Sequence, residues 1–528
     1  MAEKKETNER MEAIISLAKR RGFVYQGSEI YGGLAGTWDY GPLGVLLKKN
    51  IENLWWKMFV TDREDMYGID SAILMNPQAW VSSGHVGGFS DPLVECSNCK
   101  KRFRVDQIVD EKDYKKYVES FKSYVMHAAH SGEHHKSAHE IITKLFPSPT
   151  ENEKEYIKKT GPDIEYKLTK ATLDEVNKTA AYVGEITQIY LNLKITCSSC
   201  NKKQWGTPKQ FNMMFSTSVG ATEDAGNVTY LRPETAGGMF VNYKNVVDSF
   251  HPKLPFGLGQ IGKAFRNEIA PRDFIFRVRE LEQMEVEYFV HPDTWKEHFE
   301  AWRTEMWKYI DALGISRDHV RELEVAEDDR AHYSKRTIDF EYDYPFGRKE
   351  LYGLAYRTDF DLRSHQEGSK QNLEYFDEET KEKFLPHVIE PSLGVGRTML
   401  AVLNEAYTED EMGGEKRVYL KFMPEIAPVR VAVFPLLKNK PELVAKAREV
   451  YSVLKKELGN VLFDDNGNIG KRYRRQDEIG TPYCITVDFD TLGENAELKD
   501  TVTLRNRDTG AQERVPIDDL IGRIAPPA

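Results

Sequence analysis

The sequence predicts an α+β fold: an antiparallel sheet flanked by helices, with a helical insertion and a C-terminal α/β domain. Three observations indicate this architecture. At 528 residues the chain is too long for one hydrophobic core, so two to four domains are expected. In the central part, the expected strands follow one another through connections of hairpin length, which is typical of antiparallel pairing. From Val429 onward, strands alternate with helices, as in small α/β domains.

Two helices are expected in the N-terminal part. Residues 11–21 form a short one, and residues 42–60 form a longer one. Pro42 is placed where a first-turn proline is favoured, and apolar residues follow it at helical spacing. Residues 66–75 are then expected to be extended, ending before Pro77.

An insertion is expected at residues 106–194, where the composition shifts to charged helices. Two Cys-x-x-Cys pairs bracket it: Cys96 with Cys99, and Cys197 with Cys200. Two such pairs are typical of a tetrahedral zinc site, although the 97 residues between them exceed the usual spacing. The alternative is two reduced cysteine pairs without a metal. A second metal site or solvated helix residues could explain the histidines at 127, 130, 134, 135 and 139.

Residues 260–290 carry the densest set of charged residues among aromatic ones. We expect a strand that ends in Phe265-Arg266-Asn267-Glu268, a short loop, and a second strand. Residues two apart on a strand point to the same side, so Arg266 and Glu268 are expected to share a face. A guanidinium fork suits phosphate, and a carboxylate can accept from an exocyclic amine. The pair predicts nucleotide binding, the alternative being a surface hairpin with salt bridges.

A second candidate lies at residues 390–399, Glu-Pro-Ser-Leu-Gly-Val-Gly-Arg-Thr-Met. Gly394 and Gly396 would let the backbone approach closely before a helix. Arg397 would then lie in the first turn of that helix, where the helix dipole and the side chain both favour phosphate.

The C-terminal region is expected to contain a strand at 429–436 and a helix at 441–458 that ends at Gly459. A basic run follows in a glycine-rich stretch, with Lys471, Arg472, Arg474 and Arg475 around an aromatic residue. Such a run suits phosphate contact combined with base stacking, and the alternative is a solvated helix.

Bulk properties exclude several classes. The formal net charge of −11 argues against a general nucleic-acid coat but permits a local basic surface. No apolar run approaches the length of a membrane span, and the first residues lack the apolar stretch of a secretory signal. Five cysteines are too few for a disulfide framework, so a cytoplasmic protein is expected.

The pattern Phe-Arg-x-Glu, loop, Arg277 resembles motif 2 of the class II aminoacyl-tRNA synthetases. Its continuation, Arg-Glu-Leu-Glu-Gln-Met-Glu, is similar to the glycine-specific branch of that family. Residues 390–399 resemble motif 3, and the helix and strand within 42–75 resemble motif 1, which forms the dimer interface of the family. The resemblance implies a homodimer whose chain divides into a catalytic domain at 1–95 and 201–424, an insertion at 96–200 and an anticodon-binding domain at 425–528.

The implied activity is ATP-dependent attachment of glycine to tRNA(Gly). Glycine and ATP would form glycyl-adenylate and pyrophosphate, and the tRNA would then displace AMP. Arg266 would face the α-phosphate and Arg397 the γ-phosphate, and Glu350 would lie near ATP and Mg²⁺. With Glu268 as the third catalytic residue, the implied ATP site also includes Asn267, Phe276, Arg277, Leu281, Leu351, Gly394 and Gly396. The motif departs from the family at Leu281, where a phenylalanine usually stacks on adenine; stacking could pass to Phe276.

The implied glycine site needs acidic groups for the ammonium and crowding against larger side chains. It comprises Arg104, Glu234, Glu285, Arg357, Glu390 and Ser392. The implied tRNA contacts are Lys471, Arg472, Arg474 and Arg475. Two rivals remain: a noncatalytic synthetase-like accessory protein, and a ligase of the same class for threonine or proline.

Overall fold

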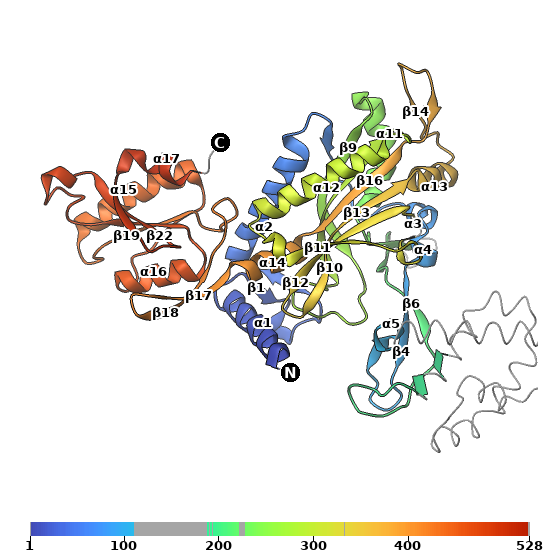
Figure 1. Cartoon of the computed structure of the whole chain (residues 1–528), viewed down its shortest axis with the longest axis horizontal. Coiled ribbons are helices and arrows are strands. Elements are labelled where there is room, and N and C mark those ends of the chain that lie inside the picture. Colours follow the sequence, from blue (N-terminus) through green and yellow to red (C-terminus); the bar gives the residue numbers. More distant parts are fainter. Residues whose placement is uncertain are drawn as a thin grey trace, which may run out of the picture. The chain divides into compact units, whose positions relative to one another are not determined.

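Figure 1 shows the computed structural model, which describes residues 2–109, 187–188, 191–192, 194–220, 228–331 and 333–525. The chain forms two compact units. Unit 1 comprises Met1–His85, Met214–Arg266 and Pro271–Ala528, and unit 2 comprises Val86–Met213 and Asn267–Ala270. The helices predicted for 106–194 fall mostly outside the described residues, and the clustered histidines fall wholly outside them.

The N-terminal helices agree with the prediction. α1 (Ala2–Arg20) includes the predicted helix and begins earlier, and α2 (Pro42–Trp56) begins at its proline and continues as a π-helical turn, Lys57–Thr61. The predicted extended segment 66–75 is only partly correct. Its first residues form β3 (Met66–Gly68), and the remainder lacks a sheet partner apart from an isolated bridge at Leu74.

A seven-stranded sheet forms the centre of unit 1 (Figure 1). Every neighbouring pair is antiparallel except the short β3 at one edge, which runs parallel to its neighbour. The predicted antiparallel sheet is therefore confirmed. Its strand order is β11 (Val320–Glu324), β12 (Arg336–Tyr344), β13 (Gly347–Thr358), β16 (His387–Gly394), β10 (Glu280–Val290), β9 (Phe256–Phe265) and β3.

Helices cover both faces of this sheet. On one face, α2, α12 (Trp295–Ala312) and α14 (Val395–Ala406) bury the larger core with the even-numbered apolar residues of β10, which are Met284, Val286, Tyr288 and Val290. On the other, α11 (Ala236–Phe250) and α13 (Phe360–Ser369) pack over a smaller core that includes Phe289. Because side chains alternate along a strand, Gln283, Glu285 and Glu287 lie on the same face as Phe289. The smaller core therefore adjoins a row of polar residues.

Shorter elements lie in the same part of unit 1. They are β1 (Val24–Gln26), β2 (Trp38–Tyr40), α3 (Pro77–Ser82), β7 (Ser216–Ser218), β8 (Val228–Tyr230), β14 (Tyr375–Phe376), β15 (Lys383–Phe384), β17 (Tyr407–Met412) and β18 (Glu415–Leu420).

The C-terminal residues form a mixed five-stranded sheet with its own apolar core. Its parallel strands are joined by helices, which confirms the predicted α/β domain. α15 (Pro441–Leu458) has the predicted bounds and ends at Gly459, whose φ of 74° suits glycine. The strand order is β20 (Val461–Phe463), β19 (Val431–Pro435), β21 (Tyr483–Val487), β22 (Thr501–Asn506) and β23 (Gln512–Pro516), with helices α16 (Ile469–Glu478) and α17 (Leu520–Ile524).

The described part of unit 2 contains a three-stranded sheet in the order β5 (Arg102–Arg104), β4 (Ser90–Glu95) and β6 (Lys209–Asn212). The short helix α5 (Val105–Ile108) directly follows β5. No helix among the described residues of the chain is both long and apolar enough to cross a membrane.

Candidate active site

Arg266 is held directly after β9 rather than on it. The strand ends at Phe265, and Glu268 lies in the following loop and belongs to unit 2. The expectation that Arg266 and Glu268 share one face of a strand is therefore wrong. Arg266 is positioned through other bonds: its backbone N–H donates to the Arg279 carbonyl at 2.9 Å, and its Nε donates to the Pro233 carbonyl at 3.0 Å.

The loop between β9 and β10 folds back on itself in a tight turn. The backbone groups of Arg272 and Arg277 exchange hydrogen bonds of 3.1 and 3.2 Å. Between them, Asp273 and Phe274 have φ angles of 60° and 58°, in the left-handed region that costs a non-glycine residue conformational energy. Phe274 packs edge-on against Trp38, with 4.7 Å between the ring centroids, and this contact helps to hold the turn.

A glycine-rich N-terminal loop supports this turn from outside. The Arg279 backbone N–H donates to the Gly36 carbonyl at 2.8 Å, and its side chain donates to the Ala35 carbonyl at 2.6 Å. Gly36 has a φ of 76°, and a Cβ there would lie 2.5 Å from Pro271 Cβ. Only glycine therefore fits where the two loops meet.

Arg397 lies in the first turn of α14, as predicted. Its Nη1 is 3.1 Å from Glu350 Oε2 and donates to the Glu350 carbonyl at 3.2 Å. Its guanidinium lies over the Phe276 ring, 4.6 Å from the centroid. Phe276 is in turn packed edge-on against Tyr344 and Phe346. Residues of the β9–β10 loop, β13 and α14 therefore meet at one place.

The two glycines before Arg397 do not have the same role. A Cβ on Gly396 would lie 2.7 Å from the Ile275 carbonyl oxygen, so glycine is required for α14 to approach the β9–β10 loop. A Cβ on Gly394 would meet nothing nearer than the Arg397 side chain at 3.7 Å. Both glycines were predicted to allow a close backbone approach. Within the protein, only Gly396 makes one.

Three cations act on one carboxylate in this region. The Arg397 guanidinium lowers the pKa of Glu350, with smaller contributions from Arg266 and Arg277 and against the opposing effect of burial. Since such effects weaken with distance, the three arginines are gathered around Glu350. The neighbouring Leu351 points to the opposite face and is buried, so its side chain is part of the core.

Glu285 is held by five donors. The Ser392 hydroxyl and Gln283 Nε2 each donate to Oε1 at 2.6 Å. The hydroxyl of Thr235 and the backbone N–H groups of Thr235 and Ala236, at 3.2 and 3.1 Å, donate to Oε2 at the start of α11. A carboxylate has about four acceptor positions, so the protein itself occupies those of Glu285. Its side chain fixes Ser392 and the helix start.

Arg357 lies at the centre of the acidic cluster and is 1% exposed. It donates to both oxygens of Asp361, at 2.7 and 2.8 Å, and to Glu390 Oε1 at 2.6 Å. Its guanidinium stacks on the Tyr333 ring, 3.8 Å from the centroid. Arg357, which was predicted as the cationic side of the glycine pocket, therefore uses its N–H groups to orient Asp361 and Glu390.

Glu234 lies between the acidic cluster and the arginines of the β9–β10 loop. Its carboxylate is 3.4 Å from His85 Nε2 and 4.0 Å from Arg357 Nη2. Although burial acts to raise it, the pKa of Glu234 is lowered to about 2 by His85, Arg357 and Arg266. Glu234 is therefore ionised throughout the physiological pH range. Its charge is stabilised by Arg357 of the acidic cluster and by Arg266 beside the β9–β10 loop.

Sequence reasoning missed four residues of this cluster. His85, whose Nδ1 is 2.8 Å from the Ser83 hydroxyl, is far from the motifs in the sequence, as is Tyr333. Asp361 follows Arg357 by only four residues but was not singled out. Glu287 did have a signal, because it continues the alternation of Gln283 and Glu285 along a strand.

The four motif cysteines come together in unit 2. Their sulfur atoms all lie within 4.8 Å of one another; Cys96 to Cys200 is 3.6 Å and Cys99 to Cys197 is 3.8 Å. Four thiolates about 2.3 Å from a tetrahedral zinc ion would be about 3.8 Å apart, so the donor set fits this metal. In the same unit, Arg104 Nη1 pairs with Asp91, and its glycine contact stays a prediction.

The C-terminal basic run lies on α16, and part of it faces the protein. Arg472 is 1% exposed and donates to the carbonyls of Pro435, Asp465 and Gly467. Its prediction as a tRNA contact is corrected, because these bonds hold it inside the domain. Tyr473 also turns inward, where its hydroxyl meets the Thr486 hydroxyl at 2.7 Å.

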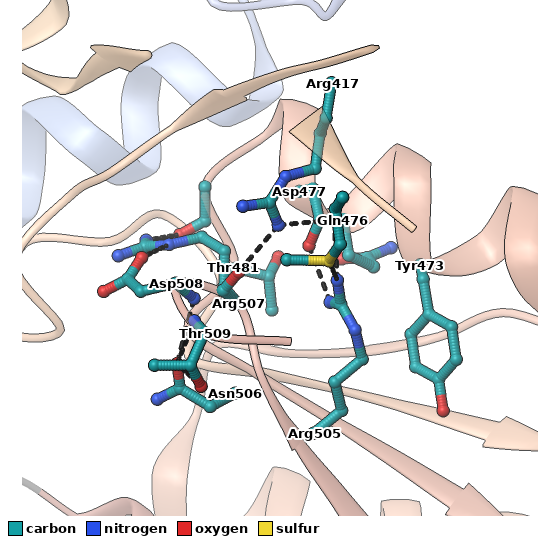
Figure 2. A network of polar contacts seen from close by, with 12 residues as sticks. Arg417, Tyr473, Gln476, Asp477, Thr481, Arg505, Asn506, Arg507, Asp508 and Thr509 are labelled. Atoms are coloured by element: carbon teal, nitrogen blue, oxygen red, sulfur yellow. Dashed lines mark hydrogen bonds and ion pairs between the residues drawn. The ribbon is translucent and has the colours of Figure 1, made fainter. Parts of the chain in front are cut away.

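Figure 2 shows what else the inner side of α16 contacts. Asp477 accepts from Arg505 at 2.8 and 2.9 Å and from Arg417 at 3.2 Å, which joins α16 to β22 and β18. Arg474 pairs with Glu415, and Arg475 pairs with Asp464 at 2.6 Å. The outward side of α16 retains Lys471 and Arg474 as exposed cations.

Three family models match this chain. The class II tRNA synthetase core domain (G, H, P, S and T) matches residues 215–406, the glycyl-tRNA synthetase insertion domain 1 matches 91–213, and the anticodon binding domain matches 430–525. With the seven-stranded antiparallel sheet and the arginines gathered beside it, they define a class II aminoacyl-tRNA synthetase.

Curated relatives identify the branch. The chain is 46% identical over 512 residues to the glycine–tRNA ligase of Clostridium acetobutylicum, covering 97% of each chain. It is 45% identical to that of Acetivibrio thermocellus, covering 98% of each, and 48% identical to that of Lachnospira eligens, covering 97% of each. The chain belongs to the glycine–tRNA ligase family.

Proposed function

We propose that this enzyme charges tRNA(Gly) through a glycyl-adenylate, releasing pyrophosphate and then AMP. The observation that carries the proposal is the position of Glu234. This ionised carboxylate adjoins Arg357 of the acidic cluster, and Arg266, whose Nε donates to the carbonyl of the preceding residue Pro233, also lowers its pKa. A small zwitterion bound at Glu234 would therefore present its own carboxylate toward the arginine-lined site.

In the first step, Glu234 holds the substrate ammonium. An oxygen of the glycine carboxylate attacks the α-phosphorus of ATP, forming one P–O bond while the P–O bond to pyrophosphate breaks. Arg266 stabilises charge on the α-phosphate, and Arg397 neutralises the leaving pyrophosphate. No protein nucleophile takes part, so the rate enhancement comes from position and charge.

In the second step, a terminal hydroxyl of the tRNA attacks the glycyl carbonyl carbon. The new C–O ester bond forms as the bond to the phosphate oxygen breaks, and AMP leaves. Glu350, half exposed and surrounded by arginines, would hold Mg²⁺ together with phosphate oxygens. When bound, the ion neutralises phosphate charge.

In this proposal the adenine base of ATP stacks between the Phe276 ring and the Arg397 guanidinium. The guanidinium already lies over this ring, and an aromatic ring with a guanidinium plane can sandwich a base. Leu281, half buried on β10 opposite Ala264, would make only apolar contact. The proposal therefore moves the stacking role from position 281 to position 276.

Glycine selectivity follows from crowding at the same site. Hydrogen bonds fix the side chains around the site, so these side chains cannot easily move aside. They are Thr235, Ser392 and the buried carboxylates of Glu285 and Glu390. A side chain on the substrate α-carbon would have to displace them, which leaves buried polar groups unpaired.

The remaining proposals concern assembly and partners. Zinc would clamp the two ends of the insertion through Cys96, Cys99, Cys197 and Cys200.

Lys471, Arg474 and Arg475 would contact tRNA phosphates from the anticodon-binding domain. The resemblance of α2 and β3 to motif 1 supports a homodimer, and the division into catalytic, insertion and anticodon-binding domains belongs to the same proposal.

Amino-acid-dependent exchange of pyrophosphate into ATP tests the proposal. We expect exchange with glycine and none with alanine, serine, threonine or proline, followed by charging of a tRNA(Gly) transcript with labelled glycine. Exchange driven by threonine or proline would contradict the assignment, and exchange with no amino acid would favour an accessory protein.

A further inference from the structure

Glu287 is a fully buried carboxyl group to which the proposed reaction gives no role. It is 0% exposed, and neither side-chain oxygen has a hydrogen-bond partner among the described residues. A buried polar group without a partner is costly, and an ionised one is far more so. The structure therefore requires an explanation for its charge state.

The strand register places Glu287 opposite a second carboxyl group. In the antiparallel pairing of β10 with β16, Glu285 lies opposite Ser392 and Tyr288 opposite Ile389, which sets Glu287 against Glu390. Side chains directly opposite on neighbouring strands have Cβ atoms about 5 Å apart, and like charges there repel. The two carboxyl groups therefore face each other on the side of the sheet that α11 covers.

The residues directly opposite the pair on the two outer strands supply no donor. β9 places Leu258 opposite Glu287, and β13 places Ala355 opposite Glu390. Arg357 donates to one oxygen of Glu390 and is otherwise bound to Asp361. No side chain in the described part of the protein donates to Glu287 in this way, so a proton is the simplest group that can bridge the two carboxyls.

We propose that Glu287 and Glu390 share one proton in the resting enzyme and so set the charge of the pocket that receives the glycine ammonium. This inference rests on the proposed function. The pair keeps a single negative charge at neutral pH and gains a second when the proton leaves. Glu287 is a positioning residue in this account, because it acts through Glu390 rather than on the substrate.

The surrounding charges agree with a retained proton. The titratable or charged side chains that act on the pair are Glu285 on β10, Arg357 on β13, Asp361 on α13, Glu234 before α11, and Tyr333. His365 on α13 acts on Asp361 and Glu234 rather than on the pair. Five carboxyl groups, counting the pair, thus face one guanidinium. Burial, followed by the Glu390 charge, raises the pKa of Glu287 well above its usual value, and burial raises the pKa of Glu390 to about 8.

Glu287→Gln tests the shared proton. The amide cannot ionise, so Glu390 alone carries the charge and no proton remains to be lost. We measure KM for glycine by pyrophosphate exchange between pH 6.5 and 8.5 at saturating ATP. Wild-type KM should fall by about 10-fold as the pair gains its second charge. In the variant, KM should stay within about 3-fold of the wild-type value at pH 6.5 and remain flat.

Glu280→Gln is the matched control, because it makes the same change at an exposed position of the same strand and should retain the wild-type pH profile. KM for ATP should be unchanged in both variants. A wild-type slope in Glu287→Gln would overturn the proposal. So would a KM more than 10-fold higher at pH 6.5 in a variant with a native circular dichroism spectrum.

Infrared difference spectra of the wild-type enzyme and of Glu287→Gln test the same claim directly. Burial raises the pKa of Asp339 to about 7, so this residue contributes a band to both proteins. A further carbonyl band of a protonated carboxylic acid should be present in the wild type alone at pH 7, shift in deuterated water and be lost by pH 9; its absence at pH 7 would overturn the proposal. If no amino acid supports exchange, the proposed function fails, while the spectra still decide whether the proton is present.

Discussion

Replacing Gly396 by alanine tests whether the first turn of α14 must lie against the loop that carries Arg266 and Arg277. The added Cβ would lie 2.7 Å from the Ile275 carbonyl oxygen, about 0.7 Å inside ordinary van der Waals contact. Either the helix start or the loop must move by a comparable distance. Arg397 follows on the helix and Phe276 follows in the loop, so the guanidinium and the ring separate.

A displacement approaching 1 Å at a site that works by positioning can cost about 100-fold in rate. We therefore expect Gly396→Ala to lower kcat/KM for ATP in glycine-dependent pyrophosphate exchange by about 10- to 100-fold. The thermal unfolding midpoint should change little, because the clash can relax at the half-exposed helix start.

Gly394→Ala is the matched control. Its φ of −93° is open to alanine, and the added Cβ would meet nothing closer than 3.7 Å. We expect activity within about 2-fold of wild type. Equal losses in both variants would refute the reasoning, because the glycines would then serve the approach of substrate rather than the packing of α14 on the loop.

Three further outcomes follow from the site. Arg357→Met should reduce the free energy of unfolding by about 3–5 kcal/mol in urea titrations, because it leaves the buried carboxylates of Asp361 and Glu390 unpaired; a loss below 1 kcal/mol would contradict this. The pKa of Glu234 is about 2 in the folded protein and 4.5 ordinarily, so its ionised form contributes stability above about pH 4.5 that is lost as pH falls toward 2. Glu234→Gln should therefore be less stable than wild type by about 3 kcal/mol at pH 7 and about equally stable near pH 2, and an equal difference at both pH values would count against this pairing. Cys96→Ser should lose the one equivalent of zinc per chain that we expect by elemental analysis, whereas Cys484→Ala, outside the cluster, should retain it; zinc-free wild-type protein would rule out the metal.

Periodicity in the sequence was enough to predict the main elements. Two helices begin at the prolines that predicted their starts, Pro42 and Pro441. Proline is a reliable marker because it is favoured in the first turn of a helix and disfavoured in the interior. The antiparallel sheet followed from short connections. The predicted strand at 66–75 is too long, because after Gly68 the chain pairs with its neighbours only at single positions, such as the bridge at Leu74.

The site was only partly predictable. Arg397 lies in the first turn of its helix, as the motif predicted, and it contacts Glu350, whose role near ATP stays a prediction. The reason given for Arg266 was wrong, because a carbonyl on a distant segment orients it. Within the basic run of the sequence, Arg472 looks like an exposed cation. In the structure it lies on the inward face of α16, where its guanidinium donates to three carbonyl groups. His85 could not have been found, because only the folding of distant segments brings it to Glu234. Asp361 lies only four residues after Arg357, so their pairing was open to prediction.

A crystal structure with a nonreactive glycyl-adenylate analogue tests the central claim most directly. We expect the analogue's ammonium within hydrogen-bonding distance of Glu234, its phosphate equivalent against Arg266, and its adenine between Phe276 and Arg397. An ammonium bound away from the acidic cluster, or an adenine that leaves Phe276 and Arg397 in contact, would contradict the account.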